Sequence, residues 1–234
     1  LSGGVGADTM SGGLGNDIYV IEDAGDVVIE NADEGIDEIR TLFNIDLAGM
    51  GFENFENVRL QGTAMTANGN DLNNILRGNA SVNNLFGNGG NDTMYGGAGN
   101  DSVDGGAGSD TLRGDDGDDF LNGGAGRDIM TGGAGADAFY FSAGHYSGTT
   151  LATADWVRDF SQADGDAIQI ELAGGAFIGS AAFSGTAGEV RFQVRGLNTM
   201  VYIDTDGDSV ADAAIRMTGV LELTAGDITF VTGG

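Results

Sequence analysis

The chain has 234 residues, of which 36 are acidic and 9 are basic, so its formal charge is −27. This charge argues against nucleic acid or an anionic membrane surface as a partner and favours cations. The chain has no cysteine and 1 histidine, which excludes disulfides and argues against zinc or copper sites. No stretch approaches the roughly 18 consecutive apolar residues of a transmembrane helix, so we expect no membrane span.

Residues 1–20 contain two consecutive nine-residue blocks, Gly3–Ser11 (GGVGADTMS) and Gly12–Val20 (GGLGNDIYV). Both follow the template Gly-Gly-x-Gly-x-Asp-x-(large apolar)-x. We predict one coil with Asp8 and Asp17 on opposite edges as metal ligands, completed by ligands from a neighbouring coil. No signal peptide precedes the blocks, so we expect a fragment or a mature C-terminal part of a longer protein.

Residues 21–68 break the pattern. Short runs of β-forming residues alternate there with acidic and glycine-containing turns, which predicts strands. We interpret the segment as an irregular β spacer rather than a ligand site, because it contains no cluster of catalytic residue types. The sequence leaves open whether this spacer stacks continuously with the repeats that follow.

Residues 69–140 form the main run, eight nine-residue blocks without an insertion. Glycines at positions one, two and four permit a tight turn, and the last three positions read as a short strand whose eighth residue points inward. Two blocks therefore make one full coil of a parallel β-roll. The eighth position is apolar in every block: Leu76, Leu85, Met94, Val103, Leu112, Leu121, Met130 and Phe139.

The sixth positions stack into two columns of carboxylates with a repeat of eighteen residues. Asp92, Asp110 and Asp128 lie on one edge, and Asp101, Asp119 and Asp137 lie on the other. Carboxylates about 4.8 Å apart repel by about 3 kcal/mol per pair at an effective dielectric of about 20. Calcium ions between the turns reverse this repulsion, since calcium takes about six to eight oxygen ligands and magnesium demands tighter octahedral geometry.

We therefore expect several Ca²⁺ ions, bound by sixth-position carboxylates and by oxygens of the adjacent turns. Besides Asp8 and Asp17, the candidate metal ligands are Gly87, Gly89, Asn91, Asp92, Gly96, Ala98, Asn100, Asp101, Gly105, Gly106, Ala107, Gly108, Ser109, Asp110, Gly114, Asp115, Asp116, Gly117, Asp118, Asp119, Gly123, Gly124, Ala125, Gly126, Asp128, Gly132, Gly133, Gly135 and Asp137. Asn74 and Asn83 occupy the sixth position of the first two blocks and carry no charge. We expect those turns to stack with weak calcium binding or none.

Residues 141–234 lack the nine-residue repeat, and we predict that they cap the open end of the roll. Their alternating runs indicate antiparallel strands, with Trp156, Phe160 and Phe177 as the core. The runs are 166–172, 190–194, 200–203, 213–217 and 228–231.

Two further features of the cap allow alternative interpretations. Residues 204–212 place three acids at alternate positions, as an EF-hand loop begins, but the glycine is misplaced and no bidentate glutamate follows. A solvated hairpin turn explains the segment as well. His145 lacks a partner for a zinc site, and we expect it at the surface.

The nine-residue blocks resemble RTX (repeats-in-toxin) calcium-binding repeats. Together with segments 138–141, 154–160, 165–166 and 221–227, they resemble the C-terminal half of serralysin-type secreted metalloproteases. The resemblance implies an all-β fold, a parallel β-roll or β-solenoid of nonapeptides capped by a C-terminal antiparallel β-rich segment that carries a type I secretion signal. It also implies that Asp155 closes the last calcium site, although the acid expected near His145 and Tyr146 is absent.

The function implied by the resemblance is a non-catalytic folding and secretion module of a larger bacterial protein, disordered without Ca²⁺ and folded outside the cell. Its partners would be calcium ions, the type I secretion apparatus and an upstream catalytic or passenger domain, for example a zinc metalloprotease. The location would be extracellular or at the cell surface. Alternatives are a surface-layer or adhesin module, the non-catalytic module of an alginate epimerase, and an autonomous enzyme, for which we find no catalytic pair.

Overall fold

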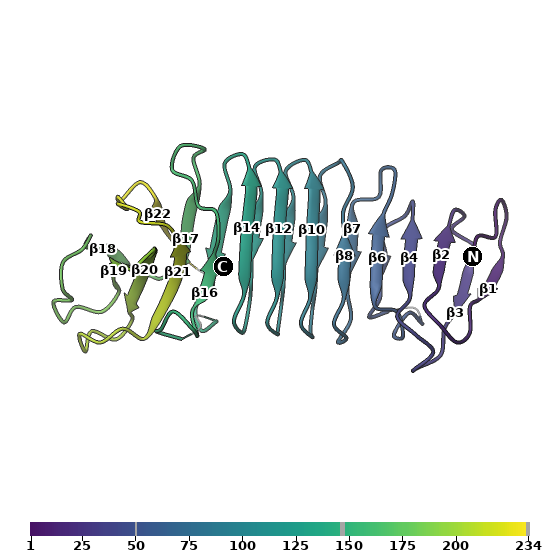
Figure 1. Cartoon of the computed structure of the whole chain (residues 1–234), viewed down its shortest axis with the longest axis horizontal. Coiled ribbons are helices and arrows are strands. Elements are labelled where there is room, and N and C mark those ends of the chain that lie inside the picture. The colour runs from purple at the N-terminus through teal and green to yellow at the C-terminus, as the bar shows by residue number, and fades with distance from the viewer. Residues whose placement is uncertain (50, 146–147, 233–234) are drawn as a thin grey trace.

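The computed structural model describes residues 1–49, 51–145 and 148–232, which form an elongated structure wound as a parallel β-solenoid (Figure 1). No helix occurs in these ranges. This part of the chain accordingly contains no helix able to cross a membrane. The all-β class and the parallel β-roll predicted from the sequence are confirmed.

Two long sheets form the walls of the solenoid, and successive strands from β4 to β17 alternate between them. From the N-terminal end, the first sheet contains β2 (Ile18–Ile21), β4 (Glu38–Thr41), β6 (Asn57–Leu60), β8 (Ile75–Arg77), β10 (Thr93–Ala98), β12 (Thr111–Asp116), β14 (Ile129–Ala134), β16 (Asp155–Val157), β21 (Ala213–Thr218), β20 (Asn198–Asp204), β19 (Glu189–Arg195) and β18 (Ala176–Phe177). The second contains β5 (Ile45–Asp46), β7 (Thr66–Asn68), β9 (Asn84–Phe86), β11 (Ser102–Asp104), β13 (Phe120–Asn122), β15 (Ala138–Phe141), β17 (Ala167–Glu171) and β22 (Ile228–Val231). A separate parallel pair, β1 (Thr9–Ser11) and β3 (Val27–Ile29), lies at the N-terminal end.

The core is a double column of eighth-position side chains. In the first sheet Met94 pairs with Leu112 and Leu112 with Met130, which confirms the predicted repeat of eighteen residues. The eight inward residues of the main run are each at most 1% exposed. Burying each one contributes roughly 1.5–3 kcal/mol, so this thin core stabilises each coil only modestly.

Glycine is required in the turns for two different reasons. A Cβ at Gly105 would lie 2.5 Å from Oδ2 of Asp110 and 2.5 Å from the carbonyl oxygen of Gly123. Gly106 has a φ of 90°, and a Cβ there would lie 2.2 Å from the carbonyl oxygen of Asn88. The first glycine of a block therefore provides space beside a carboxylate, and the second also provides a left-handed backbone.

Residues 21–68 form further coils that stack continuously on both repeat runs, a point that the sequence left open. Tyr19 pairs with Ile39, Ile39 with Val58, and Val58 with Leu76. These steps are 20, 19 and 18 residues long. The segment thus departs from the nonapeptide pattern in coil length and turn composition while keeping the same inward column.

The C-terminal segment combines two kinds of pairing. The predicted antiparallel part is confirmed by β19, β20 and β21. Two runs predicted to be antiparallel, 166–172 and 228–231, instead pair in parallel, β17 with β15 and β22 with β17. Strand β16 also pairs in parallel with β14. Strands β16 and β17 bond to the open edges of the last repeat coil, and β22 extends the second sheet beyond β17, so the roll continues beyond residue 140.

The prediction of which residues form the core of the cap is only partly correct. Phe160 is buried, and Phe177 packs against the main core in a partly buried position. Trp156 lies on the outer face of β16, where the guanidinium groups of Arg158 and Arg216 stand 4.4 and 3.8 Å from its ring centroid. Strand alternation explains the error, because Val157 takes the inward position and turns its neighbour outward.

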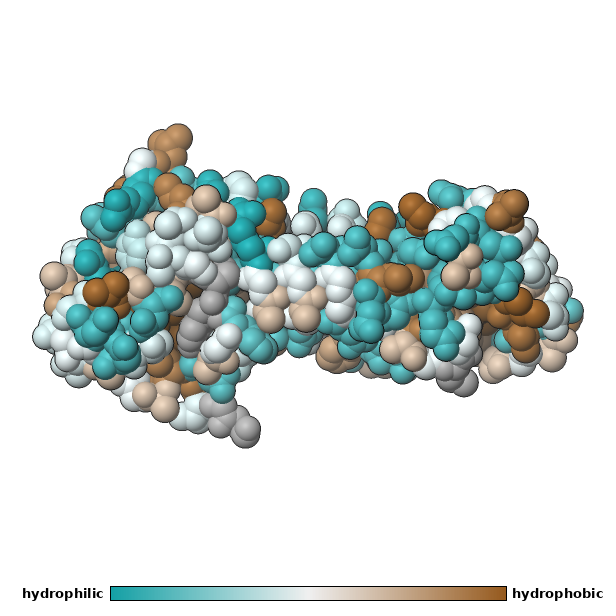
Figure 2. Space-filling model, turned by 90° about the horizontal axis from the view of Figure 1, so that it is seen from below, coloured by the Kyte–Doolittle hydropathy of each residue, from teal (hydrophilic) through white to brown (hydrophobic). Residues whose placement is uncertain are grey.

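Polar side chains cover most of the face seen in Figure 2, and apolar side chains are visible at both ends of the molecule. Exposed apolar residues of the N-terminal end include Val5, Leu14, Val27 and Ile36. The middle of the solenoid, where the repeats lie, therefore presents mainly polar side chains and glycine turns in this view.

Candidate metal centre

Aspartates of the first sheet edge form a hydrogen-bonded ladder that runs along the solenoid. The backbone N–H of Asp92 donates to Oδ1 of Asp110 at 2.7 Å, and that of Asp110 donates to Oδ1 of Asp128 at 2.9 Å. The N–H of Asp128 donates to Oδ1 of Asp155 at 3.0 Å. We call these four residues the first column. Asp155 therefore occupies the place implied by the resemblance, directly beyond the last repeat of this edge.

The opposite edge carries a second column with the same geometry. The N–H of Asp101 donates to Oδ1 of Asp119 at 2.7 Å, and that of Asp119 donates to Oδ1 of Asp137 at 3.0 Å. The N–H of Asp137 donates to Oδ1 of Asp166 at 3.0 Å. Asp166 was missed as a candidate ligand, although it stands two residues before the inward Ile168, as each repeat aspartate does before its own apolar residue.

The second carboxylate oxygen of each repeat aspartate is buried without a hydrogen-bond partner among the described residues. The six atoms are Oδ2 of Asp92, Asp101, Asp110, Asp119, Asp128 and Asp137. These six residues are at most 2% exposed. A buried anionic oxygen that lacks a partner is strongly unfavourable. The two columns therefore require cations or protons at these oxygens.

Burial shifts the acidity of both columns in the metal-free chain. Desolvation raises the pKa of four carboxyls to about 7, against a partial lowering by the N–H of the preceding coil; they are Asp92, Asp101, Asp128 and Asp137. Burial also raises the pKa of Asp110 and Asp119. Neighbouring carboxylates add to the upward shift at all six positions.

The side chains of the two asparagines at the sixth position form hydrogen bonds without a cation. Oδ1 of Asn74 accepts the N–H of Asn70 at 2.8 Å, and its Nδ2 donates to the carbonyl of Glu56 at 3.0 Å. Oδ1 of Asn83 accepts the N–H of Asn79 at 2.7 Å. This pattern agrees with the expectation that strong sites begin at Asp92, since the asparagine turns contain no orphaned carboxylate oxygen.

The turn residues predicted as ligands divide into two groups. First-position glycines pack directly against the carboxylate of their own block, where a Cβ would fill the space beside Oδ2: Gly87, Gly96, Gly105, Gly114, Gly123 and Gly132. The remaining glycines, with Ala98, Ala107 and Ala125, form the stacked turns themselves. Bridges from Ala107 to Gly89 and Ala125 join successive turns of one edge.

Several polar residues in the predicted set make contacts outside the two columns. The N–H of Ser109 donates to Oδ1 of Asn91 at 2.7 Å, and Oδ1 of Asn100 accepts the N–H of Asp118 at 3.1 Å. Asp115 forms an ion pair with Arg113 at 2.8 Å, so it does not join the second column. Asp116 and Asp118 are exposed.

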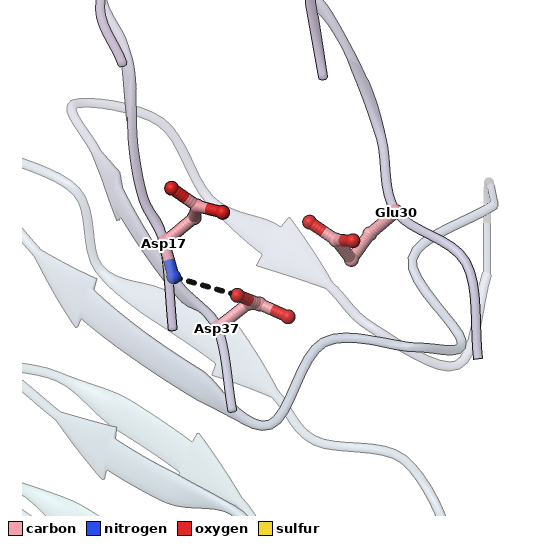
Figure 3. A group of neighbouring side chains, drawn as sticks. All are labelled: Asp17, Glu30 and Asp37. Carbon is pink, nitrogen blue, oxygen red and sulfur yellow. Dashed lines mark hydrogen bonds between the residues drawn. The ribbon is translucent and has the colours of Figure 1, made fainter. Parts of the chain in front are cut away.

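The N-terminal acids form hydrogen bonds of the same kind with residues that the sequence analysis missed. The N–H of Asp17 donates to Oδ1 of Asp37 at 2.7 Å, and the N–H of Asp37 donates to Oε2 of Glu56 at 2.8 Å. The N–H of Asp8 likewise donates to Oδ1 of Asp26 at 3.1 Å. Figure 3 shows Asp17 and Asp37, which directly precede the adjacent strands β2 and β4, with the carboxylate of Glu30 directed towards them.

His145 and the acidic segment 204–212 are the two features of the cap for which the sequence allowed alternative interpretations. His145 is exposed, and its Nδ1 lies 2.9 Å from Oγ of Ser142, whereas Tyr146 lies outside the described residues. Carboxylate oxygens of Asp204, Asp206 and Asp208 approach one another within 4.8 Å. Both oxygens of Asp204 accept N–H groups of its own loop, from residues 207 and 209, a pattern that supports the hairpin turn.

The donor set of the two columns fits calcium. Its orphaned atoms are hard carboxylate oxygens, and glycine leaves space beside each of them. Hard oxygen donors are the ligands that calcium prefers. The residues that would hold the ions are the repeat aspartates, with Asp155 and Asp166 at the C-terminal ends of the columns.

Comparison with known proteins agrees with this chemistry. The family model for the RTX calcium-binding nonapeptide repeat matches residues 1–19, 68–103 and 104–139, in 4 copies. A curated relative, "Endo-1,3-1,4-beta-glycanase ExsH" of Rhizobium meliloti (strain 1021), is 39% identical over 70 residues, which make up 30% of this chain and 14% of that enzyme. The chain thus spans only a small part of this relative.

Two solved structures are also similar, both subunits of the Azotobacter vinelandii mannuronan C5-epimerase. AlgE6R3 is 25% identical with a TM-score of 0.41, covering 68% of this chain and 78% of that one. AlgE6R2 is 25% identical with a TM-score of 0.45, covering 72% and 92%. The family match, the buried carboxylate columns and the solenoid together establish that the chain carries RTX calcium-binding nonapeptide repeats folded as a parallel β-roll.

Proposed function

We propose that this chain is a non-catalytic, calcium-dependent folding and export module of a larger secreted protein. The observation that carries the proposal is the set of six buried Oδ2 atoms that have no hydrogen-bond partner among the described residues. Their mutual repulsion opposes the coiled state, and a divalent cation between turns removes that opposition.

The free energy of calcium binding then adds to the stability of the folded state. An ion present at 100 times its dissociation constant stabilises the folded state by about 2.7 kcal/mol per site. Total stabilities of domains are only about 5–15 kcal/mol, so a few filled sites decide whether the roll forms. At cytosolic calcium the module stays unfolded and fit for passage through a type I apparatus, and millimolar calcium outside the cell folds it.

The proposal places the export signal in the C-terminal segment. Its last described strand, β22, is held by β17 at the end of the second sheet. A secretion signal in this segment would then become part of the folded roll. An upstream catalytic or passenger domain would supply any enzymatic activity, and the exported protein would act outside the cell or at its surface.

Far-UV circular dichroism of the full chain tests the calcium-dependent folding. In excess EDTA at neutral pH the spectrum should be that of an unordered chain, and added calcium should restore the β signal. Magnesium at the same concentration should not, because it tolerates irregular oxygen cages poorly. A β spectrum that chelation leaves unchanged would exclude the proposal.

A further inference from the structure

Three carboxylates converge outside the main repeat run, in the first coils of the solenoid. Asp17 precedes β2, Glu30 follows β3, and Asp37 precedes β4. One carboxylate oxygen from each lies within 4.8 Å of the other two. Figure 3 shows the Glu30 carboxylate reaching across from a separate segment of chain towards the two aspartates. Carboxylates from three separate segments of the chain therefore lie together in one cluster.

Two of these side chains are nearly inaccessible and are left with unpaired oxygens. Glu30 is 7% exposed and Asp37 is 1% exposed. Oδ1 of Asp37 accepts the N–H of Asp17, and Oε2 of Glu30 accepts the hydroxyl of Tyr19. Oε1 of Glu30 and Oδ2 of Asp37 have no hydrogen-bond partner among the described residues. Unpaired buried oxygens within a cluster of three carboxylates point to a bound cation.

The surrounding structure holds Glu30 in this position. Its backbone carbonyl accepts a hydrogen bond from Nδ2 of Asn54 at 3.0 Å. Tyr19 fills the inward position where the main run places smaller apolar residues, and its ring meets Phe55 edge-on at 5.3 Å. The hydroxyl of Tyr19 also accepts the N–H of Gly12 at 2.5 Å. Tyr19 is thus a positioning residue for the Glu30 carboxylate.

We infer that Asp17 of the second repeat block forms a calcium site with Glu30 and Asp37, two residues outside the Gly-Gly-x-Gly-x-Asp register, and that this site fastens residues 21–68 to the first repeat coil. The donors are all hard oxygens from three segments of irregular chain, an arrangement that suits the flexible coordination of calcium better than the octahedron of magnesium. This inference rests on the proposed calcium-dependent folding and extends it to a segment without nonapeptide glycine turns.

The site has a structural consequence for the N-terminal coils. The step from Tyr19 to Ile39 is 20 residues, longer than in the main run, and the coil contains the excursion that carries β3 and Glu30. An ion that joins Glu30 to the ladder closes this longer coil. Calcium therefore orders residues 9–41 through this site, independently of the columns that begin at Asp92.

Isothermal titration calorimetry of the full 234-residue chain tests the site with calcium alone as the probe. Glu30→Gln should weaken one calcium-binding event at least tenfold, so that the variant binds one ion fewer than the natural chain in the tight phase. Glu53→Gln is the matched control, because Glu53 is exposed in the same segment and lies outside the cluster. Tyr19→Phe should weaken the same event less than Glu30→Gln does.

Hydrogen exchange shows which part of the chain the lost ion ordered, and it distinguishes this loss from a general folding defect. In Glu30→Gln, calcium should no longer protect the amides of 9–41, while amides of 93–141 should remain protected as in the natural chain. Unchanged stoichiometry with unchanged protection of 9–41 would overturn the inference, as would loss of protection in both regions. A natural chain that binds no calcium would instead refute the proposed function itself.

Discussion

The backbone N–H of Asp110 donates a 2.9 Å hydrogen bond to Oδ1 of Asp128, one coil further along, while Oδ2 of Asp128 stays buried without a partner among the described residues. Each repeat aspartate therefore has two roles divided between its oxygens. One oxygen joins successive coils, and the other is available to a cation. This division explains why carboxylates occur where an amide would already complete the ladder.

Replacing Asp110 with asparagine should separate these two roles. Asp110→Asn keeps an oxygen for the ladder bond and removes the charge, so calcium affinity should fall at least tenfold, or by about 1.4 kcal/mol. The calcium-free chain should retain more β structure than the natural chain, because one buried carboxylate is removed. Calorimetry measures the first effect, and far-UV circular dichroism in EDTA measures the second.

Asn83→Ala is the matched control, since Asn83 has no orphaned oxygen. It should alter calcium affinity less than Asp110→Ala or Asp119→Ala. Equal effects on affinity at the three positions would contradict the placing of the strong sites from Asp92 onwards.

The calcium-free roll should become more stable as pH falls. Burial raises the pKa of Asp92, Asp101, Asp128 and Asp137 to about 7 in the folded chain, above the ordinary value of 3.8. The folded state therefore binds protons more tightly than the unfolded state, and stability is lost as pH rises from about 4 through about 7. Far-UV circular dichroism in calcium-stripped buffer should show this trend as a β signal that grows as pH falls from about 7 towards about 4.

With calcium present the direction should reverse, because protons compete with the ion for the same oxygens. Calcium affinity should weaken below about pH 7. A variant with asparagine at Asp92 and Asp128 should show a flatter pH dependence in the absence of calcium. Stability of the stripped natural chain that increases from pH 4 to pH 8 would contradict the assignment of these pKa values.

Space beside the carboxylates should be as necessary as their charge. Gly105→Ala places a Cβ 2.5 Å from Oδ2 of Asp110, so it should lower the stability of the calcium-loaded chain by about 1–3 kcal/mol and weaken calcium binding. The backbone at Gly105 needs no left-handed conformation, so the effect would be steric.

Gly226→Ala serves as the comparison for that change, because the nearest atom to its added Cβ is 3.5 Å away and its backbone is also compatible with alanine. Thermal unfolding with excess calcium should leave this variant close to the natural chain. If both alanine variants unfold at the same temperature, steric exclusion beside Asp110 does not limit the fold.

Removing residues 221–234 should abolish export and spare calcium binding by the main roll. The deletion removes β22, which covers the edge of β17, but it leaves every residue of the two columns in place. Secretion from a host with a type I apparatus and calorimetry of the purified chain measure the two outcomes. Full export of the truncated chain would place the signal elsewhere.

Sequence alone could define the main roll because its nine-residue spacing is unbroken. Every block from 69 to 140 has the same length and an apolar residue at the eighth position, which fixes the core, and the acids at the sixth position from Asp92 onwards fix the columns. Asp155 followed from the family resemblance. Asp37 and Asp166 escaped notice because their blocks lack the glycine turns, although each stands two residues before an inward apolar residue.

The remainder of the fold depends on tertiary pairing that no local pattern records. Coils of 20 and 19 residues hide the continuity of 21–68. Between Val157 and Met217, which are paired in adjacent strands, the chain makes a 60-residue excursion. Alternating runs predict strands in such a segment but do not distinguish the parallel return of β17 and β22 from the antiparallel hairpins of β19 to β21.

An anomalous difference map from crystals grown in excess calcium tests the central claim most directly. We predict calcium peaks between successive turns, about 2.3–2.6 Å from Oδ2 of the repeat aspartates in both columns. Turns that are stacked as in Figure 1 but contain no peak beside Asp110 or Asp119 would show that these carboxylates tolerate burial without the ion, and would contradict the account.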